Sequence, residues 1–270
     1  MEMNNNKRAE LYIQSQSSEI EILDISKIGI TIMPDLSRFK QLKILNCSYN
    51  YLTYIESIPK TVKKLNCSSN NIIQIKQINE ELEELECSNN HLEELPYMKN
   101  TNLIHICCYG NKIKELPNEL PKNLEYLCCT HNKLRTLPKL NNRLQYLKCD
   151  HNILTTLPEL PFNLQILDCS YNKIELFPRL NSNLSYLICK YNKLKLIDEL
   201  PYNLQILDCC GNNLIRIPNL PITMKKLICS FSMIKKLPII ENGVIVLISM
   251  YDDPKKENLI LPLSYFNNWY

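Results

Sequence analysis

Glycine and alanine are almost missing from this 270-residue chain, which has four glycines and a single alanine, Ala9. Phosphate-binding loops, dinucleotide-binding turns and nucleophile elbows all need closely spaced glycines. Four scattered glycines could hardly build them, and the sequence contains none of these motifs. We therefore expect a protein without enzymatic activity and without a cofactor.

Long hydrophobic segments are also missing. The first sixteen residues, MEMNNNKRAELYIQSQ, contain neither the apolar core nor the cleavage site of a secretory leader. The longest apolar stretch lies around Val244–Ile248 and is far shorter than the roughly 18 residues that span a bilayer. We expect a soluble, cytoplasmic protein that does not bind membranes.

Neither sign of charge is in large excess. The formal net charge is +3, from 31 basic and 28 acidic residues. An acidic block over residues 80–94 and basic clusters over residues 60–64 and 225–236 alternate along the chain. Proteins that bind nucleic acids instead carry a continuous basic surface that follows the phosphates. We therefore expect no nucleic-acid partner.

Cysteine, in contrast, is abundant and regularly spaced. Of thirteen cysteines, ten are separated by 20 or 21 residues: Cys47, Cys67, Cys87, Cys108, Cys129, Cys149, Cys169, Cys189, Cys209 and Cys229. We call these ten the ladder cysteines. Alignment on them reveals a unit, L-x-x-L-x-C-x-x-N-x-L, and the heptapeptide NLQILDC occurs at both 163–169 and 203–209. A fixed period of this length indicates a stacked repeat protein.

Each unit has a simple physical interpretation. Leu167 and Cys169 alternate with outward neighbours, so the pattern predicts a short strand that buries them on one side. Prolines in the following segment disfavour helix and regular pairing, and predict an extended return. Stacked units can bury their leucines through a parallel sheet, which one unit cannot do alone. The recurrent asparagine, such as Asn172, is expected to bond the backbone of the turn after the strand.

This pattern resembles the leucine-rich repeat, with cysteine at its third apolar position. The short period with L-P-x-L-P segments resembles repeats of bacterial secreted effectors, and the cysteine-rich form is similar to repeat proteins of large DNA viruses of amoebae. The resemblance implies a leucine-rich-repeat solenoid, with a curved parallel β-sheet on its concave side and extended, polyproline-II-like or 3-10 segments on its convex side. The effectors sometimes add a ubiquitin-ligase domain, which we do not expect here because about twenty residues follow the last repeat.

The repeats suggest three regions. Residues 1–19 form a polar N-terminal segment that suits a short helix, and residues 20–250 hold about ten full repeats with a degenerate repeat at each end. Residues 251–270 form an aromatic C-terminal tail. We expect this tail to cap the last repeat with Tyr265, Phe266, Trp269 and Tyr270.

The cysteines have two predicted roles. The ladder cysteines are expected to be reduced, to pack as small hydrophobic side chains and to have raised pKa values. Cys107, Cys128 and Cys210 lie outside the ladder and are predicted to be exposed. With His105, Cys107 and Cys128 offer three zinc ligands, but no C-x-x-C motif accompanies them, and a fourth ligand is missing unless His131 or Asp150 supplies it. We therefore predict no metal, and keep a metal- or redox-responsive module that uses Cys107 and Cys128 as an alternative.

The outward strand positions are the candidate binding surface, because they become aromatic or apolar between about residues 126 and 191. Tyrosine-rich surfaces with a few charges are typical of binding hot spots. The alternative is that stacked rings merely stabilise neighbouring strands. The predicted partner-binding residues are Tyr126, Tyr146, Tyr186, His131, His151, Tyr171, Tyr191, Lys148, Asp150, Asp168 and Lys190.

Taken together, these patterns predict a monomeric, non-enzymatic scaffold that binds a protein partner through its concave face. An alternative is an adaptor that presents a bound target to a ubiquitin-type machinery. If the protein is viral or an effector, its expected location is the host cytoplasm.

Overall fold

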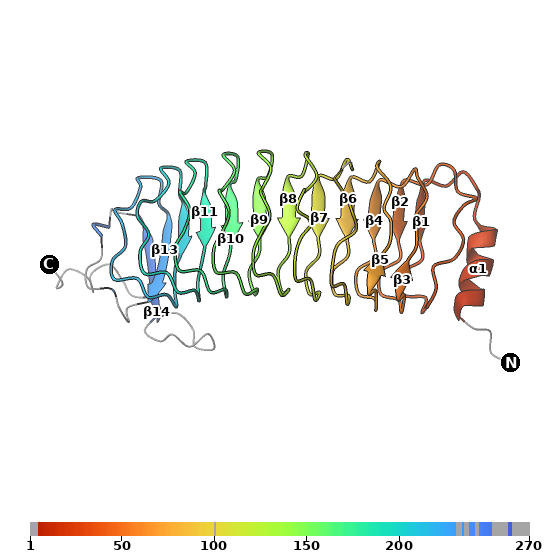
Figure 1. The fold of residues 1–270 in the computed structure, drawn as a ribbon, viewed down its shortest axis with the longest axis horizontal. Helices are drawn as coiled ribbons and strands as arrows, with labels where there is room; N and C mark the ends of the chain where they lie inside the picture. Colours follow the sequence, from red (N-terminus) through yellow and green to blue (C-terminus); the bar gives the residue numbers. More distant parts are fainter. Residues whose placement is uncertain are drawn as a thin grey trace. The chain divides into compact units, whose positions relative to one another are not determined.

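A computed structural model of the chain describes residues 5–99, 101–230, 234, 238–240, 243–249 and 259–260. The chain divides into two compact units, Met1–Leu134 and Arg135–Tyr270. Each unit is a stack of short repeats that are built around three-residue to five-residue strands (Figure 1). The described residues contain no helix with the length and hydrophobicity needed to cross a membrane.

The first unit contains a helix, the main parallel sheet and a small two-stranded sheet that is described below. Each strand of the sheet pairs in register with the next, so residues at the same repeat position stand side by side. The elements are α1 (Asn5–Ser15), β1 (Ile22–Asp24), β2 (Ile44–Asn46), β4 (Lys64–Asn66), β6 (Glu84–Glu86), β7 (His105–Cys107) and β8 (Tyr126–Cys128).

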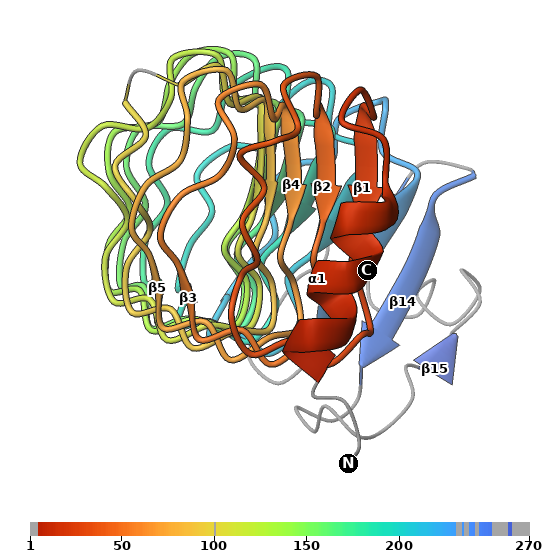
Figure 2. The same cartoon turned by 90° about the vertical axis from the view of Figure 1, so that its right-hand side faces the viewer.

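Helix α1 packs against the first repeat, beside β1 (Figure 2). It buries Ala9 and Ile13. The Asn6 side chain exchanges two hydrogen bonds of 2.9 Å with the backbone N–H and the hydroxyl of Thr31. The Arg38 guanidinium donates to backbone carbonyls at the end of the helix. The helix thereby covers apolar surface that the first repeat of a stack would otherwise expose.

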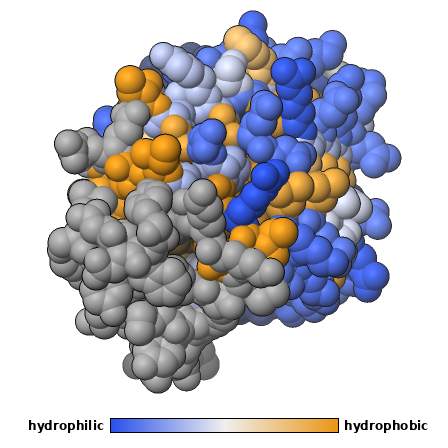
Figure 3. All heavy atoms as spheres, turned by 90° about the vertical axis from the view of Figure 1, so that its left-hand side faces the viewer, coloured by the Kyte–Doolittle hydropathy of each residue, from blue (hydrophilic) through white to orange (hydrophobic). Residues whose placement is uncertain are grey.

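The second unit repeats the same arrangement. Its strands are β9 (Tyr146–Lys148), β10 (Ile166–Asp168), β11 (Tyr186–Ile188), β12 (Ile206–Asp208), β13 (Lys226–Ser230) and β14 (Ile245–Ser249), which pair in parallel, and β15 (Leu259–Ile260), which is antiparallel to β14. Near its C-terminal end, hydrophobic side chains lie among hydrophilic ones (Figure 3), and Ile239 and Ile245 are exposed. The predicted aromatic cap of Tyr265, Phe266, Trp269 and Tyr270 lies outside the described residues.

The core is a column of equivalent residues. The second residue of each strand of the main sheet from β1 to β13 is at most 1% exposed, and every ladder cysteine is at most 2% exposed. Full burial of one such leucine side chain contributes about 2 kcal/mol. The predicted parallel solenoid and the predicted packing role of the ladder cysteines are both confirmed.

A ladder of asparagines joins successive repeats. Asn172 shows the pattern: its amide Nδ2 donates to the carbonyls of Cys149 and Cys169 at 3.0 Å and of Ser170 at 3.1 Å. Its Oδ1 accepts the N–H of Leu154 at 2.9 Å. Each asparagine therefore satisfies backbone groups of its own repeat and of the repeat before it, and the predicted structural role is confirmed. The same arrangement recurs at Asn50, Asn70, Asn90, Asn111, Asn132, Asn192 and Asn212.

The residue directly before each ladder asparagine has a left-handed backbone conformation. We call these residues the rim; φ is between 51° and 67° at Tyr49, Ser69, Asn89, Gly110, His131, His151, Tyr171, Tyr191 and Gly211. They lie in the turn that follows each strand. The sequence pattern predicts strand positions here, and this prediction is wrong because alternation alone does not show where a three-residue strand ends.

The return segments are extended, but two of them in the first unit pair with each other, contrary to the predicted lack of pairing. Strands β3 (Tyr54–Ile55) and β5 (Gln74–Ile75) form a two-stranded parallel sheet. The N–H of Lys76 donates to the carbonyl of Ile55 at 2.8 Å. Proline occupies the equivalent place in later repeats, for example at Pro96, and has no N–H to donate. Lys76, in place of proline, therefore permits this hydrogen bond between the two return segments.

Candidate functional site: the outward face of the sheet

The predicted binding residues are divided between the two units. Tyr126 and His131 belong to the first unit, and the other nine belong to the second. On the strands, Tyr126, Tyr146 and Tyr186 are half-buried and flank a fully buried leucine. Their side chains therefore lie on the face of the sheet opposite the core.

In the first unit, Tyr126 stacks on His105 of the neighbouring strand. The ring centroids are 4.3 Å apart and the planes differ by 2°. The Nε2 atom of His105 also lies 2.8 Å from a Glu86 carboxylate oxygen. Burial raises the pKa of Tyr126 to about 12, and the nearby Cys128 and Cys107 add to this effect. At the rim of this unit, the rings of His131 and Tyr109 are nearly perpendicular, with their centroids 5.3 Å apart.

In the second unit, three rim residues form a continuous stack. His151 lies 4.1 Å from Tyr171, and Tyr171 lies 4.7 Å from Tyr191, with nearly parallel rings. The ammonium of Lys190 lies 5.7 Å from the centre of the Tyr171 ring. Because the rings cover one another, the stack stabilises neighbouring turns, and its half-buried ring edges remain accessible to a partner.

Gly211 is the rim residue of the repeat after Tyr191, and it is not aromatic. A Cβ atom at Gly211 would lie 2.5 Å from Cδ1 of Tyr191, which is closer than real contacts allow. The Tyr191 ring therefore occupies the space that a side chain at position 211 would need. Glycine is required here for two reasons, the positive φ of 61° and this close approach.

Tyr146 and Tyr186 do not stack on each other. Both are in register with Ile166, which separates them on the sheet. The strand positions of the second unit therefore form an alternating surface of tyrosine and isoleucine, which continues with Ile206.

Charged side chains lie at the ends of the strands of the second unit and in the turns after them. The Nδ1 atom of His151 lies 2.8 Å from the Asp150 carboxylate. Burial raises the pKa of the Asp168 carboxyl, and Lys190 only partly offsets this effect. Asp208 was not among the predicted site residues, although it occupies the same position in the second NLQILDC segment and is only 9% exposed. That repeated heptapeptide was the available signal.

The three cysteines outside the ladder are less exposed than predicted. Cys128 and Cys210 are each 6% exposed, and Cys107 is half-buried, so the expectation of exposed thiols was wrong for the first two. Cys107 and Cys128 are neighbours in register on β7 and β8, and their thiols are close enough to hydrogen-bond. This contact and burial raise the pKa of Cys107. Neighbouring side chains on the sheet cover these cysteines, which is why they are less exposed than predicted.

Thiol labelling should separate Cys107 from the other cysteines. We expect native protein treated with iodoacetamide at pH 8 to be labelled first at Cys107, and slowly even there, because only a small fraction is thiolate. Burial raises the pKa of ladder thiols such as Cys47, to about 12. Peptide mass spectrometry would locate the label, with urea-unfolded protein labelled at all thirteen cysteines as the control. Early labelling of ladder cysteines would contradict their burial.

The metal alternative lacks a suitable ligand set. Among the described side chains, no group of three or more histidine, cysteine, aspartate or glutamate residues is arranged to hold a metal ion. His105 contacts Glu86 and Tyr126. The Ser88 hydroxyl donates to Cys107 Sγ at 3.2 Å. These contacts suit a packed surface.

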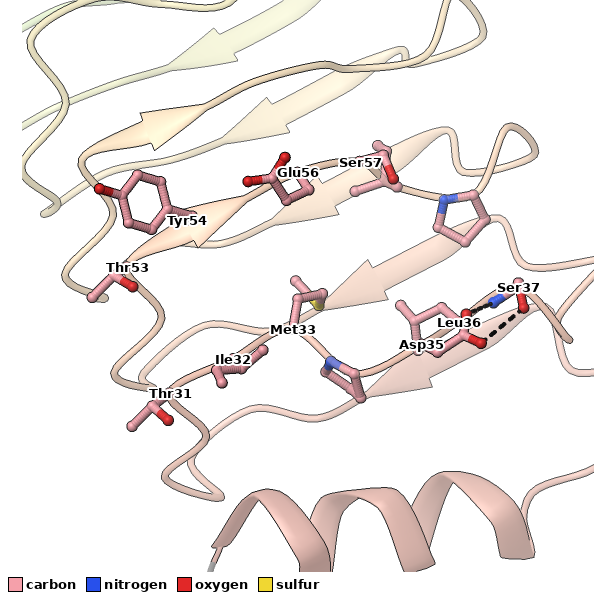
Figure 4. A pocket seen from close by; sticks show the side chains of 13 residues that line it. Thr31, Ile32, Met33, Asp35, Leu36, Ser37, Thr53, Tyr54, Glu56 and Ser57 are labelled. Carbon is pink, nitrogen blue, oxygen red and sulfur yellow. Dashed lines mark hydrogen bonds between the residues drawn. The ribbon is translucent and has the colours of Figure 1, made fainter.

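One pocket of about 440 Å³ lies between the return segments of the first two repeats, residues 31–37 and 53–59 (Figure 4). Two of its carboxylates are already engaged: Asp35 accepts hydrogen bonds from the backbone N–H and hydroxyl of Ser37, and Glu56 pairs with Lys76 at 2.9 Å. Its lining has no histidine or cysteine that could act as a base or nucleophile. The pocket therefore assembles no catalytic group.

Short parallel strands, a buried leucine and cysteine column and an asparagine ladder define a leucine-rich-repeat solenoid. No protein-family model matches the chain. No curated protein matches it either.

Solved structures with the same fold are similar to the chain. YopM from Yersinia enterocolitica WA-314 is 25% identical, with a TM-score of 0.58 over 82% of this chain and 62% of YopM. The functional domain of InlJ from Listeria monocytogenes, described as including a cysteine ladder, is 24% identical, with a TM-score of 0.65 over 84% of this chain and 52% of that one. The leucine-rich repeats of FLRT2, in an octameric complex with Latrophilin 3 and Unc5D, have a TM-score of 0.68 at 18% identity, over 88% of this chain and 92% of the matched chain. The chain thus spans less than two thirds of the YopM and InlJ chains.

Proposed function

We propose that this protein is a non-enzymatic leucine-rich-repeat scaffold that binds a protein partner on the outward face of its sheet. The main support is the composition of that face in the second unit, where tyrosines, isoleucines and a few charges stand in register above a uniform core. Similar repeats occur in complexes, as in FLRT2 with Latrophilin 3 and Unc5D. The stack needs the buried leucines and cysteines for stability, whereas the outward residues differ from repeat to repeat.

The proposed contact residues in the second unit are the half-buried rim stack and the strand tyrosines, with charges between them. They comprise Tyr146, Lys148, Asp150, His151, Asp168, Tyr171, Tyr186, Lys190 and Tyr191. Tyr126 and His131 provide a smaller aromatic surface in the first unit. The proposal includes a monomer in the cytoplasm that binds neither nucleic acid nor membranes, in keeping with the net charge of +3. No feature of the described residues favours the ubiquitin-type adaptor.

Removal of two tyrosines should test this surface. We expect Tyr146→Ala/Tyr191→Ala to weaken partner binding about tenfold or more, because truncating a hot-spot tyrosine costs over ~1 kcal/mol. Affinity capture with quantitative mass spectrometry would identify the partner, and titration of the purified partner would measure its dissociation constant.

Tyr202→Ala is the matched control, since Tyr202 is 67% exposed but lies in the turn before β12. Thermal unfolding of each variant would verify that the fold is intact. Equal capture of the same partners by the double variant and the wild type would refute the proposed surface.

A further inference from the structure

Asp208 is a charged residue whose neighbours on the adjacent strands are apolar. It is 9% exposed and stands in register between Ile188 of β11 and Ile228 of β13. Within the described part of the chain, neither Asp208 nor Asp168 has an ion pair within 4 Å. Buried carboxylates are normally paired, because loss of hydration is costly.

The turns after β10 and β12 do not require a negative charge on Asp168 or Asp208. The Oδ1 atom of Asp168 accepts the N–H of Ser170 at 3.1 Å, and that of Asp208 accepts the N–H of Cys210 at 3.3 Å. At the equivalent position in an earlier repeat, the neutral Asn66 accepts the N–H of Ser68 at 3.0 Å. An amide oxygen therefore closes this turn equally well, and the negative charge is surplus to it.

One internal cation lies near both carboxylates. Lys190 follows β11, which lies between β10 and β12, and its positive charge acts on Asp168 and Asp208 alike. Its ammonium also lies over the Tyr171 ring. Burial nevertheless raises the pKa of both carboxyls, so the single ammonium leaves them incompletely compensated. Lys148, in register with Asp168 on β9, and Asp150, whose charge also raises the pKa of Asp168, add one charge of each sign, so the group as a whole retains one negative charge.

A buried hydroxyl beside Asp168 is also incompletely bonded. Ser170 is 1% exposed and lies on the same side of the chain as Asp168, two residues further on. Its Oγ approaches the Asp168 carboxylate, but it completes no hydrogen bond in the described structure. The site therefore combines surplus negative charge with an acceptor that has unused capacity.

We propose that Asp168, Ser170 and Asp208 form a receptor for the guanidinium group of an arginine side chain on the protein partner. This inference rests on the proposed function and names the chemistry of the partner. The rim residues Tyr171 and Tyr191 lie in the turns that follow β10 and β11, and the methylene groups of an entering arginine can pack against these rings.

The spacing of the carboxylates favours a guanidinium over a metal ion. Asp168 and Asp208 lie two strands apart, so their Cα atoms are about 9–10 Å from each other. One calcium ion needs its oxygen ligands within about 2.3–2.6 Å of it. A guanidinium carries five N–H donors around a plane and can reach acceptors on both sides.

A titration with a small probe tests the receptor directly. The probe is N-acetyl-arginine methylamide, and the matched control is N-acetyl-citrulline methylamide, which has nearly the same shape without the charge. We expect the arginine probe to shift the amide NMR signals of Ser170 and Cys210 with a millimolar dissociation constant. Asp208→Asn and Asp168→Asn should each weaken this binding about tenfold, because they keep the turn acceptor and remove the charge.

Asp198→Asn is the control variant, since Asp198 is exposed in a return segment and should leave binding unchanged. Three results would overturn the inference: no local shift at 100 mM probe, equal shifts with the citrulline compound, or unchanged binding to Asp208→Asn. Tighter binding of calcium chloride at the same amides would also overturn it, in favour of a metal site.

The probe titration and the partner capture distinguish two failures. If Tyr146→Ala/Tyr191→Ala captures its partner normally while the wild type binds the arginine probe as expected, the proposed surface fails and the receptor stands. If capture depends on the tyrosines but the probe does not bind, the receptor fails and the proposed function stands.

Discussion

Replacement of Asn172 by aspartate should destabilise the second unit more than any other single change proposed for it. The substitution turns a donor into a carboxylate oxygen that faces three backbone carbonyls, of Cys149, Cys169 and Ser170. Breaking a buried polar network and leaving an uncompensated charge costs about 3–5 kcal/mol. Asn172→Ala should cost somewhat less, because it leaves the N–H of Leu154 unpaired but introduces no charge.

Equilibrium unfolding in urea, followed by circular dichroism, would measure these changes. Asn163→Ala provides the control, because Asn163 is exposed and donates a single hydrogen bond, to the Asn142 carbonyl. Its loss should cost less than about 1 kcal/mol. If Asn172→Asp and Asn163→Ala lowered stability equally, the asparagine ladder would not be a main source of cohesion between repeats.

Gly211→Ala should have the second large effect. The alanine would have to keep the positive φ of position 211, and its Cβ atom would lie 2.5 Å from Cδ1 of Tyr191. We expect a loss of about 2–3 kcal/mol, from backbone strain of about 1–2 kcal/mol and from overpacking. Thermal or urea unfolding of the purified variant would measure it.

A second substitution separates the two causes. In Gly211→Ala/Tyr191→Ala the collision disappears and only the backbone cost remains, so the second change should recover part of the lost stability. A double-mutant cycle gives this coupling energy. Strictly additive losses would show that the ring does not restrict position 211.

The spacing of the cysteines was sufficient to predict the sheet and its core. Leu167 and Cys169 recur with the chain period, and any parallel stack with that period brings equivalent residues together. The role of Asn172 was predictable for the same reason, because a turn that recurs needs the same backbone partners in each repeat.

Features that depend on neighbouring repeats could not be predicted in this way. The burial of Asp208 comes from Ile188 and Ile228, which are twenty residues away on either side. Cys128 is buried although it occupies an outward position, because outward neighbours fill the space around it. The pairing of β3 with β5 depends on which return segments lack proline, and their register is set by the whole stack.

The asparagine ladder also sets the order in which the repeats can complete their hydrogen bonds during synthesis. Asn172 bonds the carbonyl of Cys149 and the N–H of Leu154, both in the preceding repeat. The turn of one repeat therefore has unsatisfied backbone groups until the next twenty residues have been synthesised and folded onto it. During synthesis from the N-terminus, each newly made repeat completes the one made before it, while its own turn waits for its successor.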